Sequence, residues 1–203
     1  QGAARESIFK KDTEQSHVIV GARGYDMYDE RRFALGLLSE ILGGTMSSRL
    51  FIEIRERLGL SYYVQSGVES YTDSGYLVAR AGVKHNNVKK TIEKITEEFL
   101  KLKTHGPTEE EVVFAKDHLR GSLALSFESS DEIAQYYADR ELFYNQLKTP
   151  EELLKEFEKV TKNDIIKVAR DVFRTKNLNA TLVGPKDSLQ FPSIIQQISK
   201  RVS

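Results

Sequence analysis

Two side chains in the first third of the chain have the chemistry needed to hold a peptide backbone. Arg55 and Tyr62 lie seven residues apart and offer a guanidinium and a phenol as hydrogen-bond donors. Such donors can bind a peptide carbonyl or stabilise a developing oxyanion when both point into one cleft. The residues alone leave a second interpretation open and favour it. In that interpretation Arg55 pairs with Glu53 or another neighbour on the surface, and Tyr62 simply packs.

The sequence around this pair predicts a helix that is followed closely by a strand. Arg55 lies just beyond one edge of the helix's apolar face, so its stem can rest on apolar surface while the guanidinium stays at the boundary. Gly59 is expected to end the helix, and Tyr62 then begins a strand near the last helical turn. Four apolar residues fill an arc of about 100° on the helical wheel: Leu50, Phe51, Ile54 and Leu58.

The residues that are missing exclude several other chemistries. The chain has no cysteine, which excludes disulfides, thiolate nucleophiles and cysteine-based zinc sites. No two histidines are three or four residues apart, so neither HExxH nor the inverted HxxEH can be written. GxGxxG, P-loop and G-x-S-x-G sequences are absent as well. We therefore expect no cofactor and no metal site in this chain, with His17 in a strand and three solvated histidines: His85, His105 and His118.

The composition predicts a soluble globular protein. The 203 residues include 30 Lys and Arg and 30 Asp and Glu, and this net charge of zero argues against nucleic acid as a partner. No apolar run approaches the ~20 residues that span a bilayer. Residues 1–6 do not resemble a signal peptide and lack an initiator Met, which indicates a fragment or a processed form. The compartment stays open, the cytoplasm or the periplasm if the protein is bacterial.

The order of periodic segments predicts an α+β fold. Residues 15–22 alternate as a strand, residues 62–71 and 76–84 form a hairpin, and residues 178–183 form a last strand. Strands joined by a hairpin favour an antiparallel sheet. We expect an antiparallel sheet of about four strands, with the helices between them packed on one face. Residues 1–203 are expected to form a single domain, closed by a tail at 188–203.

Several helix ends carry local signals. Gly43-Gly44 is expected to end a first helix through the left-handed conformation of glycine, and Ser47 or Ser48 to cap the next helix. The tail has a weak helical pattern in Ile194, Ile195 and Ile198. Four later helix starts have the spacing of a capping box: Thr108 with Glu111, Ser129 with Glu132, Thr149 with Glu152, and Thr161 with Asp164.

The segment around Arg55 resembles a family signature. Residues 43–63 read GGTMSSRLFIEIRERLGLSYY, which is similar to the pattern LGG-x-M-S-S-R-L-F-x-E-I-R-E-x-x-G-L-x-Y of the C-terminal half of pitrilysin/insulinase-family zinc metallopeptidases. The resemblance is strongest to the branch of the mitochondrial processing peptidase and its small bacterial homologues. It extends over about residues 15–187 and includes three further segments: Thr108 to Lys116, Val160 to Ile165, and Leu182 to Pro185.

The resemblance implies an active unit of two homologous halves that face each other across a cavity. The other half carries the inverted HxxEH and the zinc, and this half contributes an Arg–Tyr pair, whose positions are those of Arg55 and Tyr62. The implied partners are a peptide or unfolded polypeptide substrate and a homologous zinc-bearing domain or subunit. We expect zinc in that partner, and we expect this chain alone to be inactive.

Two alternatives accompany the resemblance. The first is the non-zinc half of a zinc metalloendopeptidase, and the second is a non-catalytic scaffold of the same fold, like the core subunits of respiratory complexes. The presence of both Arg55 and Tyr62 favours the first alternative, because a scaffold has no need of the pair. The sequence departs from the family at Tyr63, where a smaller residue is common. Strand alternation places Tyr63 on the face opposite Tyr62.

Overall fold

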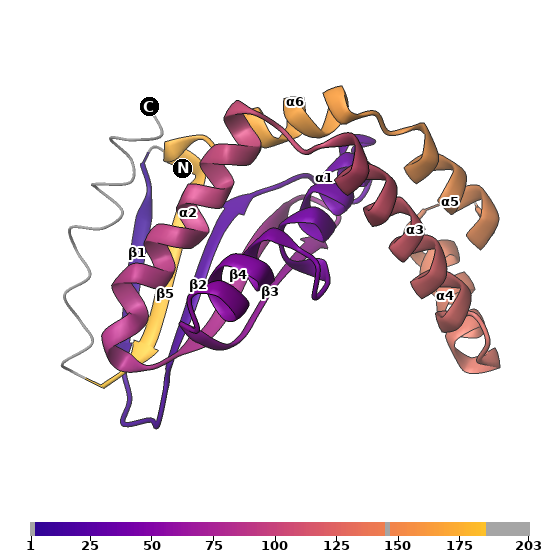
Figure 1. Cartoon of the computed structure of the whole chain (residues 1–203). Coiled ribbons are helices and arrows are strands. Elements are labelled where there is room, and N and C mark those ends of the chain that lie inside the picture. Colours follow the sequence, from indigo (N-terminus) through magenta and orange to yellow (C-terminus); the bar gives the residue numbers. More distant parts are fainter. Residues whose placement is uncertain (1–2, 145–146, 186–203) are drawn as a thin grey trace.

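The computed structural model describes residues 3–144 and 147–185. Five strands form one sheet in the order β1-β5-β2-β4-β3 (Figure 1). From β5 through β2 and β4 to β3, each strand is antiparallel to the next, which confirms the predicted sheet segments and the α+β class. The strand bounds are β1 Arg5–Lys10, β2 Ser16–Arg23, β3 Ser61–Ser70, β4 Gly75–Val83 and β5 Leu178–Gly184.

Strand β1 is the part of the sheet that the sequence did not predict. It pairs in parallel with β5, so the sheet is mixed and has five strands, where about four antiparallel strands were expected. Its sequence RESIFK is largely exposed and has no apolar alternation. An edge strand has one neighbour, and here that neighbour comes from the other end of the chain. The pattern of apolar residues within residues 5–10 therefore does not predict this strand.

One face of the sheet is apolar because alternate residues of each inner strand point to the same side. Helices α1 (Arg31–Ser39) and α2 (Val88–Thr104) cover this face, and α6 (Lys162–Val172) packs against both (Figure 1). The rings of Phe99 in α2 and Phe173 after α6 stack with their centroids 4.2 Å apart. The buried strand residues on this face are Val18, Val20, Ala22, Leu77, Ala79, Ala81, Val83, Leu178, Ala180 and Leu182.

Three helices extend from this layer beyond the edge of the sheet. They are α3 (Glu109–Ser126), α4 (Ser130–Phe143) and α5 (Pro150–Lys159), which lie on the right of Figure 1. Most of their side chains are exposed, so they contribute little to the core. Arg140 is the buried residue of α4, an unusual residue type for such a position.

Three of the four predicted capping boxes are confirmed, those that begin at Thr108, Thr149 and Thr161. The box at Ser129 is wrong, because the Ser129 hydroxyl donates to the Asp131 carboxylate and does not cap α4. The cap predicted at Ser47 or Ser48 is absent too. The Ser48 hydroxyl donates back to the Thr45 carbonyl.

Gly43 has a different role from the one that the sequence suggested. It lies in a short helix with wide π-type turns, η1 (Glu40–Gly44), and its φ of −162° is extended, not left-handed. Glycine is needed because strand β3 passes very close to it. A Cβ on Gly43 would lie 2.6 Å from the backbone nitrogen of Ser66.

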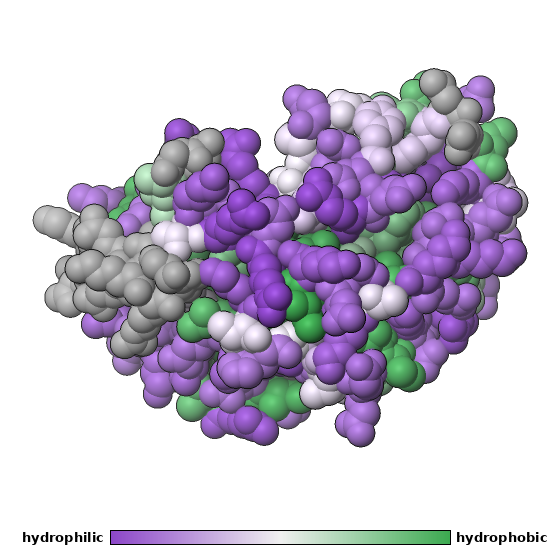
Figure 2. All heavy atoms as spheres, turned by 90° about the horizontal axis from the view of Figure 1, so that it is seen from above, coloured by the Kyte–Doolittle hydropathy of each residue, from purple (hydrophilic) through white to green (hydrophobic). Residues whose placement is uncertain are grey.

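The face of the molecule shown in Figure 2 is mostly hydrophilic, and hydrophobic residues reach the surface there in small separate groups. Among the residues that the structure describes, no helix is long and apolar enough to cross a membrane. The tail predicted at 188–203, with its weak helical pattern, lies outside the described residues.

Candidate functional site

The helix that carries Arg55 runs from residue 49 to 57, and its last seven residues form a wide-turned helix, η2 (Phe51–Arg57). Leu50 and Ile54 are completely buried, which fixes the rotation of the helix about its axis. Gly59 has a φ of +57°, so it ends the helix in the left-handed conformation, as predicted. The Leu60 N–H then donates to the Ile54 carbonyl at 2.9 Å and turns the chain toward β3.

Arg55 lies on the exposed side of this helix. Its guanidinium carbon is 5.0 Å from the centroid of the half-buried Phe51 ring, one turn earlier, as the helical wheel indicated. The predicted alternative partner, Glu53, is engaged elsewhere, at 3.4 Å from Arg57 and 3.7 Å from Lys94. Within the described part of the chain, Arg55 has no hydrogen bond and no ion pair.

Tyr62 lies at an irregularity of the sheet. Ser61 pairs with Val83 and Tyr63 pairs with Gly82, so Tyr62 is an extra residue, a β-bulge, at the start of β3. Bulges change the direction in which a side chain points, and they are common beside active sites. The Tyr62 side chain is 56% exposed, and it has no hydrogen bond to any other described residue.

Tyr63 differs from Tyr62 although the two are adjacent. Its hydroxyl lies 3.1 Å from Nδ1 of His17, and its ring covers the position where a Cβ of Gly82 would be. The bulge interrupts the alternation of β3, so strand alternation does not assign Tyr62 and Tyr63 to opposite faces of the sheet at this point.

The structure therefore places Arg55 and Tyr62 on consecutive elements, joined by the turn at Gly59, with both groups accessible. No hydrogen bond or cation–π contact joins the two side chains. Together they present up to six donors toward solvent, five from the guanidinium and one from the phenol. Neither side chain lines the two hollows described below.

Arg49 is a residue of the signature whose role the sequence did not reveal. Its Nε lies 2.6 Å from Oε1 of Glu111, and a terminal nitrogen donates to Oε2 at 2.7 Å and to the Gly106 carbonyl at 3.1 Å. Burial acts to lower the pKa of Arg49, but the hydrogen bond to Glu111 and the negative charges of Glu111 and Glu98 together outweigh burial and raise that pKa. Arg49 thus fixes the start of the helix to the α2–α3 connection at Gly106 and to the first turn of α3 at Glu111.

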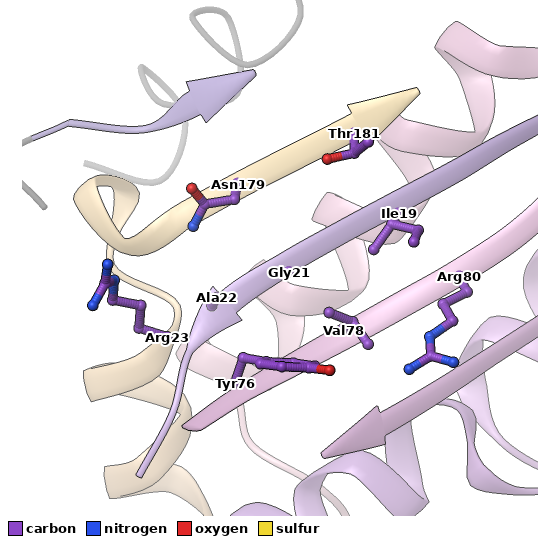
Figure 3. Close-up of a pocket in the computed structure, with 9 residues that line it drawn as sticks. All are labelled: Ile19, Gly21, Ala22, Arg23, Tyr76, Val78, Arg80, Asn179 and Thr181. Atoms are coloured by element: carbon purple, nitrogen blue, oxygen red, sulfur yellow. The ribbon is translucent and has the colours of Figure 1, made fainter. Parts of the chain in front are cut away.

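The uncovered face of the sheet has a shallow hollow of about 400 Å³ over β2, β4 and β5 (Figure 3). Gly21 lies on its floor, where a Cβ would meet Cγ1 of Val78 at 2.7 Å. Tyr76 and Arg80 project from β4 at its border. Sequence reasoning missed this hollow because its residues come from three strands that are far apart in the chain.

The described residues do not suit a zinc ion. They contain no group of three or more His, Cys, Asp or Glu side chains that could hold a metal. The histidines have other neighbours: His17 contacts Tyr63, His85 contacts Ser16, His105 contacts Thr104, and His118 lies 2.6 Å from Glu40.

Comparison with known proteins identifies the family. The model of the peptidase M16 inactive domain matches residues 2–119. A zinc protease of Bacillus subtilis, YmxG, is 36% identical over 89% of this chain and 44% of its own length. A zinc protease of Rickettsia felis is 35% identical over 89% of this chain and 44% of its own length. The chain thus belongs to the M16 peptidase family and matches its inactive domain, as the resemblance indicated.

Solved structures share the fold. A protease from Helicobacter pylori superposes with a TM-score of 0.83 at 24% identity, over 91% of this chain and 45% of that one. Complex III2 from Candida albicans contains a chain with a TM-score of 0.82 at 14% identity, over 98% of this chain and 49% of that one. At these identities the likeness concerns the fold alone. The chain spans less than half the length of the curated relatives it matches.

Proposed function

We propose that this chain is the non-zinc half of a zinc metalloendopeptidase. In this proposal Arg55 and Tyr62 hold the main chain of a peptide substrate opposite a homologous, zinc-bearing domain or subunit. The observation that carries the proposal is that both groups are exposed at the junction of η2 and β3 and that neither has a side-chain partner for its polar atoms among residues 3–144 and 147–185. A guanidinium without a carboxylate partner and a phenol without an acceptor are available to a ligand.

The chemistry proposed for this half is electrostatic. The described residues do not suit zinc, so the metal and its water belong to the proposed partner. Arg55 and Tyr62 would donate to a substrate carbonyl and stabilise the negative charge that develops on its oxygen during hydrolysis. Such donors act best when they are held in place before reaction. The buried Leu50 and Ile54 hold the helix, and the bulge holds Tyr62 at the start of β3.

A non-catalytic scaffold of the same fold is the second candidate. Its support is the fold likeness to a chain of Complex III2. A scaffold would use this surface only for packing against other subunits, so the hydroxyl of Tyr62 would have no effect on any reaction. The two candidates therefore differ in a measurable way.

The test uses the complete protein that contains this chain, with a fluorogenic peptide as substrate. We expect Tyr62→Phe to lower kcat/KM by ~10²–10³, the usual effect of removing one oxyanion donor. Tyr63→Phe is the matched control, because it removes a neighbouring hydroxyl that bonds to His17, and it should leave kcat/KM within about threefold of the wild type. This chain by itself should not cleave the peptide. Wild-type activity in Tyr62→Phe would favour the scaffold.

A further inference from the structure

Two arginines that lie outside the proposed site share a hollow between helices α1, α4 and α5, toward the end of the molecule away from β1 (Figure 1). Arg32 of α1 and Arg140 of α4 line a hollow of about 420 Å³, together with Tyr144 and Lys148. None of its residues belongs to η2 or β3, the elements of the site proposed above.

Arg140 is 9% exposed, yet among the described residues no carboxylate lies within ion-pairing distance of it. Its guanidinium carbon is 4.3 Å from the centroid of the Tyr144 ring and 5.1 Å from that of Tyr136. These rings attract the positive charge, but a ring face accepts no more than part of what five N–H donors require. Burying a guanidinium that has no carboxylate partner among the described residues costs free energy, so Arg140 is available to an anion.

Arg32 adds a second positive charge to the same hollow. Its guanidinium carbon is 5.7 Å from the centroid of Tyr144, so both arginines approach one ring. Its hydrogen bond is a long one, 3.4 Å, to the Asp29 carbonyl. Burial lowers the pKa of Arg32, and the charge of Arg140 adds to that lowering, while Tyr144, Asp29 and Glu156 offset part of it. Repulsion between two partly desolvated cations is relieved by an anion that contacts both.

The carboxylates that line the hollow do not supply this anion. Glu156 is engaged by Lys148 at 3.1 Å and by Lys159 at 3.0 Å, and these bonds lower its pKa. Glu30 is exposed at the N-terminus of α1 and forms no ion pair with a described residue. Three cationic side chains and two carboxylates therefore line the hollow, and the most buried cation, Arg140, is paired with neither carboxylate.

We propose that this hollow binds an oxyanion, either phosphate or the carboxylate of a peptide, with Arg140 as the main donor and Arg32 as the second. A guanidinium forms two parallel hydrogen bonds with either group. The Tyr144 ring, which contacts both arginines, holds them in position for this binding.

Isothermal titration of the complete protein with inorganic phosphate, at constant ionic strength, tests the proposal. We expect saturable binding that Arg140→Gln and Arg32→Gln each weaken by roughly 10–100-fold, because hydrogen bonds to charged groups are lost. Arg120→Gln is the matched control. Arg120 is exposed on α3 and already paired with Asp117 and Glu158, so this variant should bind phosphate like the wild type.

A second arm identifies the source of the anion. A short peptide with a free C-terminal carboxylate is compared with the same peptide amidated, and binding of only the free form indicates a peptide carboxylate. Binding of phosphate but neither peptide indicates phosphate. No binding of phosphate or the free peptide, or equal weakening by the Arg120 variant, would overturn the proposal. If circular dichroism shows that Arg140→Gln is unfolded, Arg32→Gln decides the outcome in the same way.

Discussion

The two ends of the helix at residues 49–57 carry the same residue type in opposite surroundings. Arg49, at the start, forms a two-pronged pair with Glu111 and a bond to the Gly106 carbonyl. Arg55, less than two turns later, has a ring beneath it and no acceptor among the described residues. The same family signature thus contains one arginine that stabilises the fold and one whose guanidinium is free to bind a ligand. Residue type alone does not distinguish the two.

The largest effect on stability is expected from removing the paired arginine. Arg49→Ala should lower the free energy of unfolding by about 2 kcal/mol, between the values for exposed and for buried ion pairs, because it leaves Glu111 partly buried without its partner. Chemical denaturation measures the change. Arg57→Ala is the control, since Arg57 is exposed and its pair with Glu53 is weak. A loss below about 0.5 kcal/mol would show that Arg49 is no more structural than a surface arginine.

A smaller effect is expected from acid. Burial alone would raise the pKa of Glu111, but hydrogen bonds from Arg49 and from the Thr108 backbone outweigh burial and lower that pKa. A carboxyl with a lowered pKa in the folded state stabilises the fold above its unfolded pKa, about 4.3, and this contribution disappears as the pH falls through the folded value.

We therefore expect Glu111→Gln to be less stable than the wild type by about 1 kcal/mol at neutral pH, with the gap closing below pH 4. Urea denaturation at a series of pH values measures this gap. Glu110→Gln, at a neighbouring exposed position, should show no such gap. A difference in stability that stays constant down to pH 3 would mean that the charge of Glu111 does not stabilise the fold.

The smallest effect is expected at Glu53, which the simplest sequence interpretation paired with Arg55. Because Glu53 contacts Arg57 and Lys94 at the surface, Glu53→Gln should change stability by less than about 0.5 kcal/mol and leave peptidase activity unchanged. Differential scanning calorimetry and the peptide assay measure both quantities. If Glu53→Gln lowered kcat/KM as strongly as a substitution of Arg55, the position of the Arg55 guanidinium would depend on Glu53.

The sequence predicted the features that depend on neighbouring residues. The stop at Gly59 and the capping boxes at Thr108, Thr149 and Thr161 are local hydrogen-bond patterns, and they form as expected. The box at Ser129 failed because a competing acceptor, Asp131, lies only two residues away.

Features that depend on distant contacts were not predictable from local patterns. Strand β1 exists through its pairing with β5, and Gly43 is required by the passage of β3. The bulge that releases Tyr62 from the ladder, and the partner that holds Arg49, also come from tertiary packing. For the site, the sequence indicated Arg55 and Tyr62 by resemblance, and the structure adds that both are exposed and that neither side chain has a hydrogen bond or ion pair within the part of the chain that it describes.

The central claim is that Arg55 is available for substrate and Arg49 is not. The direct test compares Arg55→Ala with Arg49→Ala in the complete protein, measuring kcat/KM and the melting temperature of each. We predict that Arg55→Ala lowers kcat/KM by ~10²–10³ while stability changes by less than about 0.5 kcal/mol, and that Arg49→Ala mainly lowers the melting temperature. Arg55→Ala with wild-type kcat/KM, or with a loss of activity matched by a loss of stability, would contradict the account.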